Sequence, residues 1–118
     1  MANRWQGKDD VLVAVYRVVD ETELAFLAAH GHCGSNANLS GKYFALTIEG
    51  ARAFASAPIN AGATITRTTL PASMVRRGTM LNDPGTNGAG MSVFFAQQQL
   101  AALYDTMPVP VILSGAET

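Results

Sequence analysis

Five short segments with the composition of β-strands are spread through the 118 residues, and only short helical patterns separate them. Each segment is rich in β-branched, aromatic or other apolar residues, which favours a strand with at least one buried face. Two prolines in or beside the last segment place it at a sheet edge. The five segments cover residues 11–17, 39–46, 62–70, 91–96 and 109–113, and the prolines are Pro108 and Pro110. The pattern predicts an α+β fold with small helices against a twisted, mostly antiparallel sheet.

Two of the intervening segments carry helix start signals. Asp20 is a candidate N-cap, Glu23 follows it at the spacing of a capping box, and Gly31 is a candidate helix end. Thr47 is a candidate N-cap for a second helix, which the apolar spacing carries to Ala55. We therefore expect one helix before the second strand and another directly after it.

The remaining segments are less regular. Pro71 suits the first position of a short helix over residues 72–77, and residues 97–104 form a turn or a short helix. Residues 79–90 hold three glycines and one proline, which predicts a long loop.

Length and charge limit the kinds of protein that this sequence fits. A chain of 118 residues forms one domain, and the polar residues 1–10 read as a linker from a larger carrier. The net charge is −1 and the only adjacent basic pair is Arg76–Arg77, which argues against a nucleic-acid partner. No apolar run reaches the ~18 residues that a membrane-spanning helix needs. The single cysteine, Cys33, excludes a disulfide within the chain.

The sequence lacks the residues that several catalytic mechanisms require. Between Gly50 and Ala116 the only acidic residues are Asp83 and Asp105, which argues against a hydrolase with paired carboxylates. The sequence has no P-loop, no GxGxxG and no HExxH motif. His30, His32 and Cys33 allow a metal site or a Cys–His nucleophile, but they equally suit a polar helix C-terminus, where histidine favours the helix dipole. We predict no metal site.

Two positions stand out as candidate functional residues. Arg17 ends an apolar strand, where its guanidinium either binds an anion such as a phosphate or leaves the strand into water. Tyr43 and Phe44 are adjacent in a predicted strand and so point to opposite faces. One of these rings can enter the core while the other lines a cleft or lies exposed.

The segment Gly41-Lys42-Tyr43-Phe44-Ala45 resembles the Gly-Lys-X-X-Tyr-Phe-Ala signature of the poly-ADP-ribose polymerase and diphtheria-toxin clade, with two residues fewer. The run from Val15 to Val19, followed at once by residues 20–24, resembles mono-ADP-ribosyltransferase toxin domains of bacterial polymorphic effectors. These domains end Rhs-type effectors, including the branch called TreTu. The resemblance covers residues 11–103.

The resemblance implies an ADP-ribosyltransferase-like split, mostly antiparallel sheet that holds NAD, the substrate, in a central cleft. By this resemblance Arg17 holds NAD and Tyr43 stacks on its nicotinamide ring. The family's catalytic Glu falls near Met91, where this chain has none. The resemblance implies that glutamines after the strand take its place, with Asp83 and Asn87 in the preceding loop as further polar residues. The implied catalytic residues are Arg17, Tyr43, Gln97 and Gln99, and the implied NAD-binding residues are Arg17, Val18, Tyr43, Phe44, Thr47 and Phe54.

The function implied is that of an antibacterial toxin that transfers ADP-ribose from NAD to a target-cell protein. The TreTu-like resemblance makes elongation factor Tu a candidate target and inhibition of translation the expected effect. A larger effector, delivered for instance by type VI secretion, would carry the domain into the target-cell cytoplasm, and a cognate immunity protein would neutralise it. The alternatives are an NAD glycohydrolase toxin that depletes NAD and a non-catalytic interaction domain on the same fold.

Overall fold

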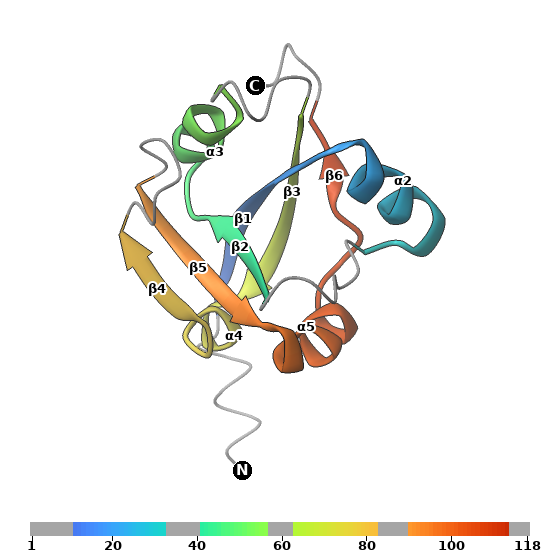
Figure 1. Ribbon diagram of the computed structural model, residues 1–118. Helices are drawn as coiled ribbons and strands as arrows, with labels where there is room; N and C mark the ends of the chain where they lie inside the picture. The colour runs from blue at the N-terminus through green and yellow to red at the C-terminus, as the bar shows by residue number, and fades with distance from the viewer. Residues whose placement is uncertain (1–10, 33–40, 57–62, 83–89, 114–118) are drawn as a thin grey trace.

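The computed structural model describes residues 11–32, 41–56, 63–82 and 90–113, and Figure 1 shows their arrangement. In these described ranges, six strands form one sheet in the order β4-β5-β2-β1-β3-β6. The strands are β1 (Leu12–Val19), β2 (Gly41–Ala45), β3 (Thr64–Pro71), β4 (Thr79–Asn82), β5 (Met91–Ala96) and β6 (Val111–Ile112). The helices are α2 (Glu21–His30), α3 (Ile48–Ala55), α4 (Ala72–Val75), the 3-10 turn η2 (Gln97–Gln99) and α5 (Leu100–Thr106).

Strand pairing confirms the expected class. All pairs of neighbouring strands in the sheet are antiparallel, and short helices flank them, so the fold is α+β with an antiparallel sheet. Strand β6 lies at an edge, as Pro108 and Pro110 predict. Within the described residues, no helix is long and apolar enough to cross a membrane.

The two halves of the sheet meet at a narrow joint between β1 and β2. Strand β1 pairs with β3 along its whole length, and β2 does the same with β5. Between β1 and β2 the described residues form a single register pair, Tyr16 with Ala45. The sheet therefore consists of two half-sheets, β1-β3-β6 and β2-β5-β4, which few backbone contacts connect.

The predicted helix signals are confirmed, with one correction at Glu23. The Asp20 side chain accepts a hydrogen bond from the Glu23 main-chain nitrogen at 2.8 Å, and Gly31 ends α2 with a φ of 79°. The Thr47 hydroxyl accepts from Gly50 at 2.9 Å and starts α3. Only half of the expected capping box forms, because the carboxylate of Glu23 binds cations on β1 and β2 instead.

Residues 79–90 are not one continuous loop, which corrects the sequence prediction. Thr79–Asn82 form β4 and pair with Met91–Phe94 of β5. The proline and all three glycines of this stretch follow Asn82, and residues 79–82 alone are ordinary strand formers at an exposed edge. Residues 83–89 lie outside the described part of the chain. Helix α4 is also shorter than predicted: it ends at Val75, whereas the sequence pattern predicted a helix up to residue 77.

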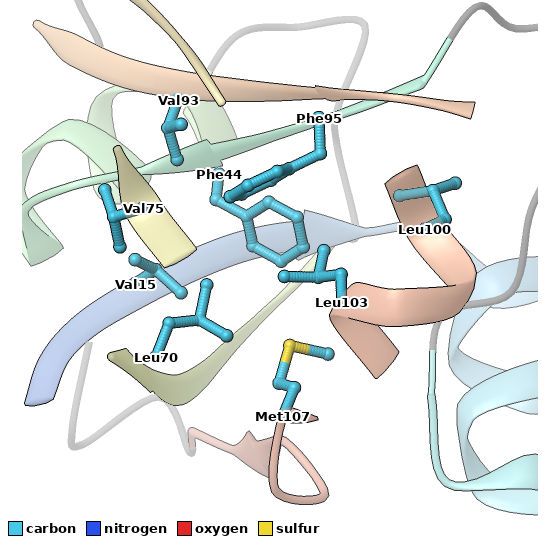
Figure 2. Packing of buried hydrophobic residues seen from close by; sticks show 9 residues of the cluster. All are labelled: Val15, Phe44, Leu70, Val75, Val93, Phe95, Leu100, Leu103 and Met107. Atoms are coloured by element: carbon cyan, nitrogen blue, oxygen red, sulfur yellow. The ribbon is translucent and has the colours of Figure 1, made fainter. Parts of the chain in front are cut away.

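The main hydrophobic core lies on one face of the sheet, where α4 and α5 contribute to it (Figure 2). Phe44 and Phe95 meet there edge to face, with ring centroids 5.9 Å apart. The core consists of Val15, Phe44, Leu70, Val75, Val93, Phe95, Leu100, Leu103 and Met107. A smaller cluster of Ala45, Ala51, Ile65 and Leu113 lies on the opposite face, where α3 covers the sheet. Adjacent residues of β2 thus serve different cores, since their side chains alternate between faces.

Candidate functional site

An open pocket lies at the joint between the half-sheets, beside α3. Its empty space, part of it open to solvent, is about 300 Å³. Residues from β1, β2, β5 and α3 contribute to its walls, so both half-sheets are needed to form it. The lining residues are Tyr16, Arg17, Val18, Tyr43, Ala45, Ala51, Phe54 and Ser92.

Four of the residues predicted to bind NAD line this pocket. They are Arg17, Val18, Tyr43 and Phe54, which come from β1, β2 and α3. The two other predicted residues are not part of the lining. Phe44 is 1% exposed in the main core on the other face of β2, and the Thr47 hydroxyl caps α3.

Tyr43 offers an accessible aromatic ring at the pocket. Its side chain is 42% exposed, and its ring lies 4.8 Å from that of Phe94, centroid to centroid, at a tilt of 51°. Phe94 is its register partner on β5, so the contact is a cross-strand aromatic pair. The pair holds the Tyr43 ring beside the pocket and leaves part of the ring available for stacking.

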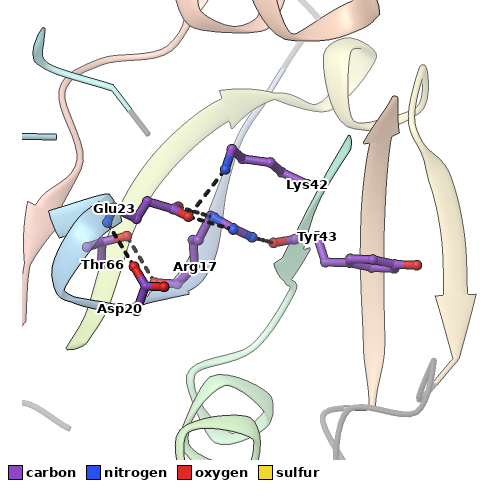
Figure 3. Close-up of polar contacts among 6 residues, drawn as sticks. All are labelled: Arg17, Asp20, Glu23, Lys42, Tyr43 and Thr66. Carbon is purple, nitrogen blue, oxygen red and sulfur yellow. Dashed lines mark hydrogen bonds and ion pairs between the residues drawn. The ribbon is translucent and has the colours of Figure 1, made fainter. Parts of the chain in front are cut away.

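Arg17 lies between Glu23 and the main chain of β2 (Figure 3). Its Nε and Nη2 donate to the two carboxylate oxygens of Glu23, the Nη2 bond measuring 2.9 Å. Its Nη1 donates to the main-chain oxygen of Tyr43, also at 2.9 Å. The Tyr43 ring points away from the guanidinium in Figure 3. The structure therefore links Arg17 to Tyr43 through the Tyr43 main-chain carbonyl, and the guanidinium does not face the Tyr43 ring.

Sequence reasoning missed the carboxylate partner of Arg17. Glu23 approaches from the first turn of α2, and its Oε1 also accepts a hydrogen bond from Lys42 Nζ at 3.2 Å. The side chains of Arg17, Glu23 and Lys42 are 15%, 14% and 4% exposed, so this ion-pair cluster is largely removed from water. One sequence signal could have identified this partner: an acidic residue follows the arginine at the strand end by six positions. The pairing was not predicted because the capping-box spacing already gave Glu23 a role.

Sequence reasoning also missed Tyr16 and Ser92. Ser92 is only 3% exposed, and it pairs in register with Ala45 across β2 and β5. It directly follows Met91, which is 42% exposed and is not a lining residue. A shift of one residue along a strand moves a side chain to the other face, so the pocket receives Ser92 rather than Met91.

The predicted catalytic glutamines lie at the other end of β5 from Ser92. Gln99 Oε1 accepts from the Ala96 nitrogen at 2.8 Å, and its Nε2 donates to the Arg77 oxygen at 3.0 Å. Gln97 Oε1 is buried and has no hydrogen-bond partner among the described residues. Neither glutamine lines the pocket, and their catalytic role stays a prediction. Asp83 and Asn87 fall outside the described residues.

The histidines that allowed a metal site belong to an aromatic cluster. His32 stacks on Tyr104 with centroids 4.6 Å apart, and Phe26 lies 4.2 Å from His30. Cys33 falls outside the residues described. In the rest of the chain that the structure covers, no group of three or more His, Cys, Asp or Glu side chains could hold a metal ion. These rings join the end of α2 to α5.

Comparison of this chain with known protein families, with curated proteins and with solved structures finds no match.

Proposed function

We propose that this chain is an NAD-dependent mono-ADP-ribosyltransferase that modifies a protein of a target cell. The observation that carries this proposal is the pocket at the joint, where Arg17, Val18, Tyr43 and Phe54 meet around one space. The resemblance of the sequence assigned all four of these residues to NAD, although they come from three separate elements. The narrow joint between the half-sheets also supports the split sheet that the resemblance implies.

The lining of the pocket suits the nicotinamide end of NAD. The pocket is open to solvent, so in the proposed complex the nicotinamide ring lies against the lining while the rest of the dinucleotide extends outward. Ala45, Ala51 and Phe54 supply an apolar wall. The exposed Tyr43 ring suits a cationic nicotinamide, because π-stacking and cation–π attraction act together.

The Arg17 guanidinium lies on the Phe44 side of β2, with its Cζ 6.0 Å from the centroid of the Phe44 ring, and the Tyr43 ring points away from it. A guanidinium binds phosphate oxygens through charge-assisted hydrogen bonds, so the NAD diphosphate is its natural ligand there. Glu23 fixes the plane of the guanidinium from the side of α2. In the proposed complex, the diphosphate extends from the Tyr43 side of the joint to Arg17, which keeps its contact with Glu23.

The proposed reaction breaks the bond between nicotinamide and ribose. The electron pair of this bond leaves with nicotinamide, the ribose gains oxocarbenium character, and a nucleophile of the acceptor protein attacks it and loses a proton. None of the described lining residues carries a carboxylate, and among them Ser92 lies closest in sequence to Met91, near which the family's Glu falls. Its hydroxyl can accept a hydrogen bond from a ribose hydroxyl but adds no negative charge, so the transition state is less stabilised than with a carboxylate.

An NAD glycohydrolase is the second candidate function. The specific observation in its favour is the same lining, in which no residue described by the structure has a carboxylate to orient or deprotonate a protein acceptor. The pocket is also open to solvent, which suits water as the acceptor. The product would then be free ADP-ribose.

The biological setting follows from the resemblance. We propose a toxin domain of a larger effector that acts in the target-cell cytoplasm, with elongation factor Tu as the candidate acceptor. A cognate immunity protein would block the open pocket.

The deciding experiment incubates the purified protein with labelled NAD and a bacterial lysate. A transferase produces a discrete labelled protein band together with free nicotinamide, and the mass of the band identifies the acceptor. Nicotinamide release without a band establishes the glycohydrolase instead. If NAD stays intact in every lysate tested, both enzymatic functions are wrong.

A further inference from the structure

The Glu23 carboxylate binds two cationic side chains, those of Arg17 and Lys42, at one edge of the joint. Its Oε1 accepts from both Arg17 Nη2, at 2.9 Å, and Lys42 Nζ, at 3.2 Å, while Oε2 binds Arg17 Nε. Arg17 lies on β1 and Lys42 on β2, so one carboxylate from α2 links the two half-sheets (Figure 3). Because both cations share one oxygen, they lie close together and would repel each other without it.

The backbone alone connects these strands only weakly. The described residues give β1 and β2 a single register pair, Tyr16 with Ala45. The hydrogen bond from Arg17 Nη1 to the Tyr43 oxygen adds a second link on the same strand, two residues away from Ala45. Side chains therefore supply part of the connection that ladder hydrogen bonds supply elsewhere in this sheet.

We propose that Glu23 is a positioning residue, which acts through Arg17 to fix the joint and with it the Tyr43 ring. The carboxylate orients the guanidinium by a two-point contact with Nε and Nη2, and the remaining nitrogen, Nη1, donates to the Tyr43 main-chain oxygen. The Tyr43 ring extends from that same residue, and Tyr43 lines the pocket together with Ser92 and Val18. The consequence for NAD rests on the proposed function, whereas the positioning itself does not.

The charge and the length of the Glu23 side chain both matter for this role. Glu23→Gln keeps the length but loses the charge, and its amide group turns a donor toward one of the two cations. Glu23→Asp keeps the charge and is one methylene shorter. Glu21→Gln is the matched control, because Glu21 is an exposed acid in the same first turn and loses the same charge.

The test records NMR spectra of the full chain and follows the Tyr43 ring and the Ala45 and Ser92 amides. Glu23→Gln should shift these signals, Glu23→Asp should shift them less, and Glu21→Gln should leave them in place. Arg17→Lys keeps the positive charge but lacks the planar guanidinium, so it should shift the same signals as Glu23→Gln. If Glu23→Gln does not fold, the Arg17→Lys spectrum tests the proposal in its place. Signals that stay at their wild-type positions in the folded variant overturn the proposal.

Kinetics of nicotinamide release connect this role to NAD. We expect Glu23→Gln to raise the KM for NAD by about tenfold or more, a loss of substrate binding, with a smaller change in kcat. Glu23→Asp should recover part of the KM. A fall in kcat alone would overturn the assignment, because it would show that Glu23 acts on the reaction rather than on the pocket. If the wild type releases no nicotinamide, the proposed function fails and the NMR shifts alone decide the positioning role.

Discussion

Arg17 on β1 donates a hydrogen bond from Nη1 to the main-chain oxygen of Tyr43 on β2, at 2.9 Å. The strands that carry them share one register pair, so this side-chain bond is part of what holds the two half-sheets together. The same two residues line the pocket. The arginine that the resemblance assigns to NAD thus has a structural partner on each side of it.

Replacing Arg17 by lysine should therefore affect both stability and NAD turnover. A lysine ammonium lacks the planar set of donors with which the guanidinium binds both Glu23 and the Tyr43 oxygen. At least one charge-assisted hydrogen bond is therefore lost, which lowers the free energy of unfolding by about 1.5–3 kcal/mol. Thermal unfolding and nicotinamide release measure the two effects. Arg67→Lys, on an exposed position of β3, is the control and should change neither.

Tyr43 and Phe44 should respond oppositely to truncation. Tyr43→Ala removes a ring that is 42% exposed and should cost less than about 1.5 kcal/mol of stability, while NAD turnover falls sharply. Phe44→Ala empties the main core and should cost about 3–5 kcal/mol. Urea unfolding and NAD turnover of both variants test this, and Tyr43→Phe should stay active because it keeps the ring. An active Tyr43→Ala enzyme would contradict the stacking role.

Ser92→Ala should reduce nicotinamide release without unfolding the protein. The change removes one hydroxyl from the pocket wall, so we expect a stability change within about 1 kcal/mol and a turnover loss of roughly tenfold or more. Ser73→Ala on α4 serves as the control. Full turnover in the Ser92 variant would remove this residue from the proposed reaction.

Gly41 should not tolerate a side chain. A Cβ at this position would lie 2.1 Å from the Phe95 oxygen and 2.9 Å from the Ala96 Cα, both main-chain atoms of the paired strand. Gly41→Ala should therefore separate β2 from β5 and cost at least about 3 kcal/mol, the upper end for overpacking. Gly90→Ala meets no neighbour within 4 Å and carries only the strain of a φ of 71°, about 1–2 kcal/mol. Equal stability losses in the two variants would contradict this steric account.

Gln99→Ala should destabilise the protein and leave the turnover of folded molecules unchanged. Its amide joins the start of η2 to Arg77 through two hydrogen bonds, each contributing about 1 kcal/mol. Chemical denaturation gives the stability loss, and NAD turnover is then measured well below the midpoint. A turnover loss in fully folded protein would instead support the catalytic role that the resemblance implies.

Local sequence signals predicted most of the elements. Asp20, Thr47 and Gly31 act through bonds within a few residues, so their caps could be identified without knowing the fold. Strand β4 was missed because its four residues gain their structure from pairing with β5, a contact that the sequence does not display. The proline and the glycines that predicted a loop all follow the last residue of β4.

The candidate site was only partly predictable, since it depends on which faces and strand ends meet. The alternation rule allowed Tyr43 or Phe44 to face a cleft, and the structure decides for Tyr43. The role of Glu23 requires α2 to fold back onto β1 and β2, and no local pattern states this. Ser92 replaces Met91 in the pocket because of register, which sequence spacing fixes only to within a residue.

Binding of NAD at the joint is tested by a titration of the isotopically labelled protein with NAD, followed by NMR. We expect the shifted signals to belong to the pocket residues Val18, Ala45, Ala51 and Ser92, and nicotinamide alone to shift a subset of them. Tyr43→Ala should weaken NAD binding by about tenfold or more, as expected for a lost stacking contact. Saturating NAD that leaves these signals unchanged, or that shifts only residues away from the joint, would contradict the claim that this pocket binds NAD.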